Sequence, residues 1–137
     1  MRFLVAVALL ISGCVDVAGG AVEARWDLRD ATANRIDCAQ AAVAQMRFAL
    51  MPADGGIDPC DVEPRCTFAC DRGGGTTPFI IPEGQYSMVL RPLDSSGQAL
   101  GPGQGITTPA PIVRSVYSGR LTDLNVNLII VNRELHP

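Results

Sequence analysis

Residues 22–29 read Val-Glu-Ala-Arg-Trp-Asp-Leu-Arg, and apolar and charged side chains alternate through the whole stretch. Successive side chains of a β-strand point to opposite faces, so this alternation predicts a strand with one buried and one exposed face. We expect Trp26 at the centre of the buried face. The same period of two returns further along the chain, and it therefore decides the fold class.

Four later segments repeat the pattern. Their inward side chains are predicted to be Met46, Phe48 and Leu50; Phe68; Tyr86, Met88 and Leu90; and Leu124, Val126, Leu128 and Ile130. Ile129 and Val131 would then lie on the outer face of the last strand. A further strand is expected over residues 112–117. In the core, Trp26 is expected to face Tyr86 or Leu128.

The connections between these strands are rich in turn residues. Residues 94–97 (Asp-Ser-Ser-Gly) indicate a hairpin and Ser118-Gly119 a turn, while residues 71–76 indicate a glycine-rich turn and residues 30–37 a polar loop. Pro92 cannot donate a backbone hydrogen bond. It therefore predicts an edge position or a bulge at the end of its strand.

Only one segment favours a helix. Asp37 and Gln40 have the spacing of a capping box and alanines follow, which predicts one short helical turn near residues 38–43. Strands do not alternate with long helices anywhere in the pattern. The sequence therefore predicts an all-β domain, a two-sheet antiparallel β-sandwich of seven to eight short strands.

The N-terminus has the layout of a secretory signal. Arg2 precedes a nine-residue apolar run over 3–11, and the small residues Ser12 and Gly13 precede Cys14. As a helix the run would span about 14 Å, against a hydrocarbon core of roughly 30 Å. It is therefore too short to cross a membrane.

The sequence Ile11-Ser-Gly-Cys14 resembles the bacterial lipobox, in which the cysteine is lipidated and begins the mature protein. The resemblance implies a lipoprotein signal peptide over 1–13, a lipidated N-terminus and tether over 14–20, a β-sandwich domain over 21–133 and a tail over 134–137. The membrane would be a partner through lipid, such as palmitate, on Cys14. The alternative is a plain signal peptide with Cys14 buried or bridged.

The same resemblance implies a location. An Asp directly after the lipidated cysteine retains such proteins in the inner membrane, and here Val15 follows Cys14 while Asp16 comes one place later. The displaced Asp favours the outer membrane of the cell envelope, with the domain on its periplasmic or its surface face.

Four cysteines remain after Cys14. An even number in an exported chain implies two disulfides, for which three pairings are possible. We favour Cys60–Cys66, which closes a five-residue loop, together with Cys38–Cys70, which would tie an early segment to a later strand. A four-cysteine zinc site is the alternative, but the spacing lacks the C-x2-C pairs of structural zinc sites. We therefore expect no metal and no cofactor.

Composition limits the function classes. Removing the first 13 of 137 residues leaves 124, the size of one domain, and removing Arg2 changes the formal charge from −3 to −4. A chain without a basic patch is not expected to bind nucleic acid. The single histidine, His136, is next to the last residue, where chains usually fray, so a Ser–His–Asp triad is not expected. A carboxylate pair stays open, because no spacing singles one out.

Residues 81–90, Ile-Pro-Glu-Gly-Gln-Tyr-Ser-Met-Val-Leu, resemble the strand start of prealbumin-like sandwiches, which include carboxypeptidase regulatory-like domains. In that family the glycine makes the turn and the tyrosine enters the core. Residues 94–97 and 118–128 resemble two hairpins of the same family. With the lipobox in front, the chain is similar to small lipoproteins of high-GC Gram-negative bacteria.

The resemblance implies a prealbumin-like or immunoglobulin-like sandwich that binds or supports rather than catalyses, and it carries over no catalytic residues. We therefore expect a non-enzymatic envelope lipoprotein with an envelope protein or a glycan as its partner. The alternative is a carbohydrate-binding accessory module. Sugar stacking needs exposed rings, and alternation places Trp26, Phe48 and Tyr86 in the core, which leaves Phe79 and Tyr117 as candidates.

Overall fold

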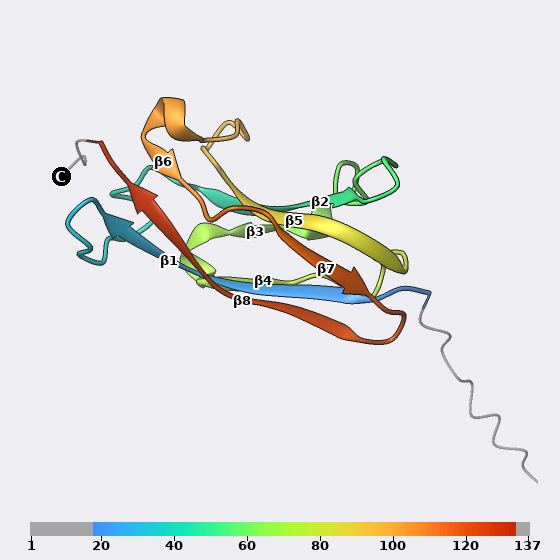
Figure 1. Cartoon of the computed structure of the whole chain (residues 1–137). Helices are drawn as coiled ribbons and strands as arrows, with labels where there is room; N and C mark the ends of the chain where they lie inside the picture. Colours follow the sequence, from blue (N-terminus) through green and yellow to red (C-terminus); the bar gives the residue numbers. More distant parts are fainter. Residues whose placement is uncertain (1–17, 134–137) are drawn as a thin grey trace, which may run out of the picture.

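The computed structural model describes residues 18–133. In this part of the chain eight strands form two four-stranded sheets, which pack face to face (Figure 1). Sheet I has the order β4-β1-β8-β6 and sheet II the order β3-β2-β5-β7. The strands are β1 (Ala21–Asp30), β2 (Gln45–Pro52), β3 (Thr67–Ala69), β4 (Gly74–Thr76), β5 (Gly84–Leu93), β6 (Ile106–Thr107), β7 (Ile112–Val116) and β8 (Leu121–Val131).

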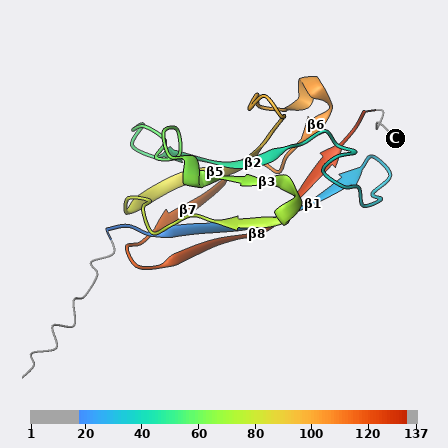
Figure 2. The same ribbon diagram turned by 180° about the vertical axis from the view of Figure 1, so that it is seen from behind.

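The predicted fold class, an all-β two-sheet sandwich, is confirmed. Five of the six strand pairs in the described residues are antiparallel, but β1 and β8 run parallel through the middle of sheet I. Seen from behind, β3 and β4 close one side of the sandwich (Figure 2). They are joined by the 3-10 turn η2 (Cys70–Arg72).

The segment predicted as a short helical turn forms an isolated turn and no helix. The capping box is present: the Asp37 carboxylate accepts from the Gln40 N–H at 2.7 Å, and the Gln40 side chain accepts from the Asp37 N–H at 3.0 Å. Ala42 then adopts a φ of +51°, which stops the turn from propagating. The described helical elements are the 3-10 turns η1 (Pro64–Cys66), η2 and η3 (Pro102–Gln104).

The core follows the predicted alternation in β1, β2, β3 and β5. The buried side chains of these strands include Val22, Ala24, Trp26 and Leu28; Met46, Phe48 and Leu50; Phe68; and Tyr86, Met88 and Leu90. The Phe48 and Phe68 rings pack edge to face with centroids 5.8 Å apart. These side chains belong to one hydrophobic cluster between the sheets.

Two predicted loops contain paired backbone. Residues 71–76 are predicted as a turn, but after η2 they continue as β4, which pairs with Glu23–Arg25 of β1. Within 30–37 the chain folds straight back on β1: the Ile36 N–H donates to the Leu28 carbonyl, and the Asp30 N–H donates to the Asn34 carbonyl. Both segments therefore form backbone hydrogen bonds with β1. Their polar and glycine-rich composition had predicted loops instead.

The predicted register of β8 is wrong beyond Leu124. In β8, Leu124 and Asn125 together oppose the single residue Ala24, because the pairing shifts between Glu23↔Asp123 and Arg25↔Val126. This is a β-bulge, and Asn125 adopts the left-handed φ of +58° within it. One extra residue moves every later side chain to the opposite face.

The bulge reverses the expected faces of the last strand. Ile129 and Val131, predicted outside, are fully buried, whereas Val126 and Leu128, predicted inside, are 56% and 47% exposed. Leu128 therefore cannot face Trp26 in the core. The buried polar side chain that results, Asn127, donates a hydrogen bond to the Leu124 carbonyl at 3.4 Å.

Two further turn predictions have different outcomes. Pro92 lies on β5 beyond the last residue that pairs with β7, but it is not at a free edge: β2 pairs with it on one side, and on the other its carbonyl accepts from the Leu100 N–H of the returning chain. Ser118-Gly119 does turn the chain, with Gly119 at a φ of +73°. However, β7 and β8 belong to different sheets, so this turn is a corner between sheets and not the expected hairpin.

Trp26 gives the first test of the core. Trp26→Ala should lower the free energy of unfolding by about 3–5 kcal/mol, because it removes a buried ring whose indole N–H donates to the Cys70 carbonyl at 2.7 Å. Urea unfolding followed by circular dichroism measures the loss. The matched control is Glu23→Ala on the outer face, expected to change stability by less than about 0.5 kcal/mol. Equal losses would contradict the orientation of β1.

Asn125 tests the bulge. Asn125→Val should destabilise the domain by roughly 1–2 kcal/mol, because a β-branched residue is strained at a positive φ, whereas Asn125→Gly should be tolerated. Leu128→Val is the control, since Leu128 is exposed on the same strand. Thermal unfolding of the three variants checks the order. An Asn125→Val protein as stable as Asn125→Gly would rule out the bulge.

Candidate functional site

The predicted lipidation site lies outside the described residues. Cys14, the signal segment 1–13 and the tail 134–137 all fall there. Gly19 and Gly20, which the sequence assigned to the tether, are buried against the domain. The site residues that can be placed are therefore the four remaining cysteines and the side chains around them.

The structure joins Cys38 to Cys70, with Cα atoms 6.0 Å apart. Cys70 is buried and Cys38 is half-buried. The Cys70 N–H donates to the Ala44 carbonyl at 3.0 Å, and the Cys70 carbonyl accepts from the Trp26 indole. This disulfide thus fixes the connection between β1 and β2 against the end of β3.

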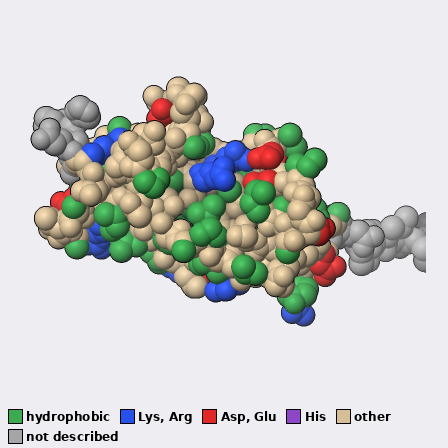
Figure 3. Space-filling model, turned by 45° about the horizontal axis from the view of Figure 1, so that its top comes forward, with side chains coloured by type: hydrophobic (Ala, Val, Ile, Leu, Met, Phe, Trp, Pro, Cys, Tyr) green, Lys and Arg blue, Asp and Glu red, His purple; other side chains and the backbone are tan. Residues whose placement is uncertain are grey.

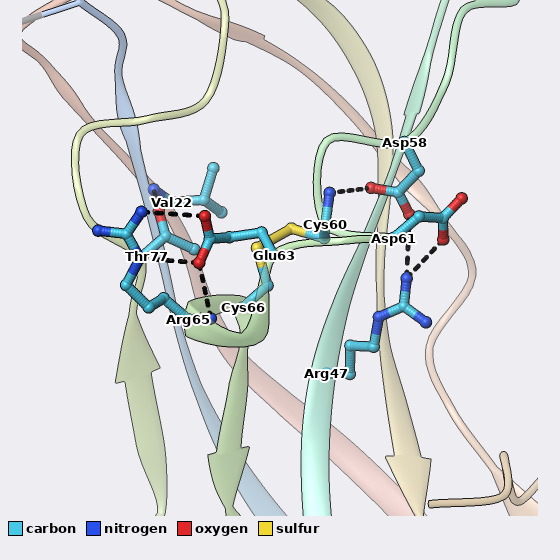
Figure 4. Close-up of a disulfide and its surroundings, with 9 residues drawn as sticks. All are labelled: Val22, Arg47, Asp58, Cys60, Asp61, Glu63, Arg65, Cys66 and Thr77. Atoms are coloured by element: carbon cyan, nitrogen blue, oxygen red, sulfur yellow. Dashed lines mark hydrogen bonds and ion pairs between the residues drawn. A yellow bond between two sulfur atoms is a disulfide. The ribbon is translucent and has the colours of Figure 1, made fainter.

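The structure joins Cys60 to Cys66 within the loop that follows β2, with Cα atoms 5.5 Å apart (Figure 4). The Cys60 N–H donates to the Asp58 carboxylate at 2.8 Å. Arg47 of β2 reaches toward the same loop, with its guanidinium 2.6 Å from the Asp61 carboxylate and 3.8 Å from that of Asp58 (Figure 4). The disulfide therefore closes the loop, and the ion pair with Arg47 holds the loop to sheet II.

This arrangement leaves the four cysteines without free thiolates. All four sulfurs are in disulfides, so none is a thiolate that could bind zinc. Glu63 of the loop binds Arg65 at 2.7 Å, and this hydrogen bond lowers the pKa of Glu63. Within residues 18–133 no group of three or more His, Cys, Asp or Glu side chains is placed to hold a metal.

A cavity of about 290 Å³ lies along the edge of β1, between the start of β4 and the segment 35–37. Trp26, Leu28 and the Cys38–Cys70 disulfide supply its apolar wall. Asp27 lies at its rim and binds two arginines, with Arg29 at 2.7 Å and Arg35 at 2.9 Å. The cavity thus combines an apolar wall with an ion-paired rim.

Four described carboxylates, Asp27, Asp30, Glu63 and Asp94, are poorly suited to acid catalysis. Hydrogen bonds from Arg35 and then Arg29 hold the pKa of Asp27 below its ordinary value, so the side chain is ionised at neutral pH. Hydrogen bonding also lowers the pKa of Asp30, Glu63 and Asp94. A general acid in a glycosidase needs a raised pKa. The resolved shifts of these carboxyl groups are all in the opposite direction.

The aromatic side chains divide as the sequence predicts. Trp26, Phe48 and Tyr86 are buried in the core, whereas Phe79 and Tyr117 are exposed. Burial, followed by the charges of Asp54 and Asp58, raises the pKa of Tyr86, and its hydroxyl donates to the Pro82 carbonyl at 2.7 Å. Only Phe79 and Tyr117 of these rings could therefore stack on a ligand.

Sequence reasoning missed the Asp27–Arg35 pair, because it assigned residues 30–37 to a loop. A signal was present in the repeated order of turn residues. Asp30 accepts hydrogen bonds from Thr32 and from the Asn34 N–H, and Asp94 accepts the equivalent bonds from Ser96 and the Gln98 N–H. The hairpin signal at 94–98 could have identified its counterpart at 30–34.

The exposed surface is mixed in character. Figure 3 shows arginine and acidic side chains close together on one face, with hydrophobic side chains scattered among them. In the part of the chain that the structure covers, no helix has the length and apolar character needed to cross a membrane.

No protein-family model and no curated protein matches the chain. It is similar to the crystal structure of GBS52, the minor pilin in the Gram-positive pathogen Streptococcus agalactiae, with 13% sequence identity and a TM-score of 0.46. The match covers 83% of this chain and 46% of the pilin, so the chain spans about half the length of that protein.

The two disulfides should contribute unequally to stability. They close loops with sequence separations of 32 and 6. In the chain-entropy model these loops correspond to about 4 and about 2 kcal/mol, so replacing Cys38 and Cys70 by Ser should cost more than replacing Cys60 and Cys66. Urea unfolding of the two double variants tests this order. Non-reducing peptide mapping of the unmodified protein provides the control, and a Cys38–Cys60 or Cys38–Cys66 peptide would contradict the pairing.

Proposed function

We propose that the chain is a lipoprotein of the bacterial cell envelope, held in the membrane by lipid on Cys14. In this proposal the disulfide-linked sandwich is a non-enzymatic binding or structural module. The observation that carries it is the combination of a lipobox-like sequence with a β-sandwich that has two disulfides. Disulfides persist in oxidising compartments outside the cytoplasm.

The details of the strand start support a prealbumin-like affiliation. Gly84 adopts a φ of +158° at the start of β5, and Tyr86 enters the core two residues later. These are the roles that the resemblance assigns to the glycine and the tyrosine. With Asp16 displaced from the position that retains lipoproteins in the inner membrane, the outer membrane is the proposed destination.

The chemistry of the surface supports a binding or structural role rather than catalysis. The cavity beside β1 is bordered by Asp27, whose carboxylate oxygens are occupied by two arginines. An enzyme would need a nucleophile with a base, or a carboxyl group with a raised pKa. The described site residues supply ion pairs and disulfides instead.

A carbohydrate-binding accessory module is the second candidate. The observation that favours it is the exposure of Phe79 and Tyr117, since exposed rings can stack on sugar faces. Isothermal titration with soluble peptidoglycan fragments distinguishes the two functions. Binding that is lost in both Phe79→Ala and Tyr117→Ala would support the carbohydrate module.

Cys14→Ser tests the anchor. Serine has no thiol to carry the lipid, so the variant should lose incorporation of a fatty-acid analogue. Without the acyl chains that stable anchoring needs, it should move from the detergent phase to the aqueous phase. Metabolic labelling followed by detergent partitioning measures both effects. Ser12→Ala keeps the cysteine and serves as the control. Unchanged labelling and partitioning of Cys14→Ser would rule out the anchor.

A further inference from the structure

The chain enters the sandwich at Gly19 and Gly20, where backbone hydrogen bonds hold it against two other segments. The Gly20 N–H donates to the Ile81 carbonyl at 2.8 Å and the Gly20 carbonyl accepts from the Ile81 N–H at 3.0 Å, while the Gly119 N–H donates to the Gly19 carbonyl at 3.0 Å. A Cβ at Gly19 would lie 2.6 Å from the Ile81 carbonyl oxygen, so the backbones are in direct contact. Figures 1 and 2 place this point beside the turn between β7 and β8.

The distance from this point to the proposed lipid is short. Gly19 is the fifth residue after Cys14 in the sequence. Even a fully extended chain of that length spans at most about 18 Å. If Cys14 carries lipid, as proposed above, the end of the sandwich that contains Gly19 is therefore close to the bilayer surface.

Three large apolar side chains are exposed around the same point. Phe79 is 44% exposed, Tyr117 53% and Leu121 49%. Phe79 lies two residues before Ile81, and Leu121 pairs with Ala21 in sheet I. The Tyr117 carbonyl is close to Gly20, and the Arg120 carbonyl accepts from the Ala21 N–H at 3.0 Å. The exposed side chains thus surround the place where the chain enters.

The composition of this end fits a membrane–water interface. Aromatic residues such as tyrosine are enriched at that interface, and arginine can lay its stem along apolar surface while its charged head stays in water. The Arg120 guanidinium lies 5.9 Å from the centre of the Tyr117 ring. Asp54 and Glu83 lie near the same end of β5, so the local charge does not favour anionic lipid. Contact would depend on apolar burial and not on charge.

We propose that this end of the sandwich, formed by Phe79, Tyr117, Arg120 and Leu121 and here called the anchor end, rests on the bilayer. The Phe79, Tyr117 and Leu121 side chains enter the interfacial layer. The inference rests on the lipid anchor at Cys14. It adds a defined orientation, in which the strands of the sandwich rise from the membrane.

Tryptophan fluorescence can test the orientation. Phe79→Trp and Tyr117→Trp place a reporter at the anchor end, and Leu128→Trp places a matched exposed reporter seven residues after Leu121 along β8, about 23 Å away. The native Trp26 is 6% exposed and gives a constant background. The full-length mature proteins are reconstituted in phosphatidylcholine vesicles with or without bromine on the acyl chains, because bromine quenches nearby indoles.

The expected result is strong quenching of the added reporter at 79 and at 117, to less than about half of its emission, with little change at 128. Equal emission in both vesicle types at 79 and 117, from protein that floats with the vesicles, would overturn the orientation and leave the anchor intact. Equal quenching at all three positions would also overturn it. Protein that neither floats nor carries lipid would overturn the anchor and the orientation together.

A glycan on the same rings would give a different result. Soluble peptidoglycan fragments would then change the emission of the reporters at 79 and 117, while brominated lipid would not. That outcome would overturn the membrane orientation and assign the rings to sugar binding. Neutral phosphatidylcholine is the probe, so any quenching found cannot arise from attraction to anionic lipid.

Discussion

Cys70 is held by a disulfide and by hydrogen bonds, and through them it connects segments that are distant in the sequence. Its sulfur joins Cys38, its N–H donates to the Ala44 carbonyl, and its carbonyl accepts from the Trp26 indole. Trp26 belongs to sheet I, whereas Cys70 directly follows β3 of sheet II. Few aromatic side chains fill this core, so packing alone would hold the two sheets together less firmly. The bonds around Cys70 add a covalent link and hydrogen bonds that fix the sheets to each other. Trp26, Cys38 and Cys70 also form part of the wall of the cavity beside β1.

Much of the fold could be predicted because period-two alternation is a local property of a half-buried strand. β1, β2 and β5 follow it, and so does the first part of β8. The prediction fails at Asn125 because one residue in a left-handed conformation reverses the faces of all that follow. Asn tolerates that conformation better than most residues, but the alternation around it reads equally well in either register. Only the pairing with Ala24 decides between them.

The disulfides of the candidate site could be predicted from the sequence. The contacts that form only when distant segments come together in the fold could not. Four cysteines in an exported chain indicate two disulfides by their number alone. Asp27 and Arg35 carry no such signal, because they meet only after the 30–34 turn brings Arg35 back beside β1. Exposure of Phe79 and Tyr117 was expected, since neither falls on the inward face of a predicted strand. Their position around Gly19 and Gly20 could not be read from the sequence.

The parallel pairing of β1 and β8 sets the height of the molecule. The first and last strands start at the same end, so the eleven residues of β8 carry the chain about 36 Å along the sandwich before it leaves. The turn at 30–34, organised by Asp30, follows the end of β1 and lies at the end of the sandwich opposite the anchor end (Figure 1). A protein that rests on the bilayer by its anchor end would hold this turn about the length of β8 away from the membrane surface.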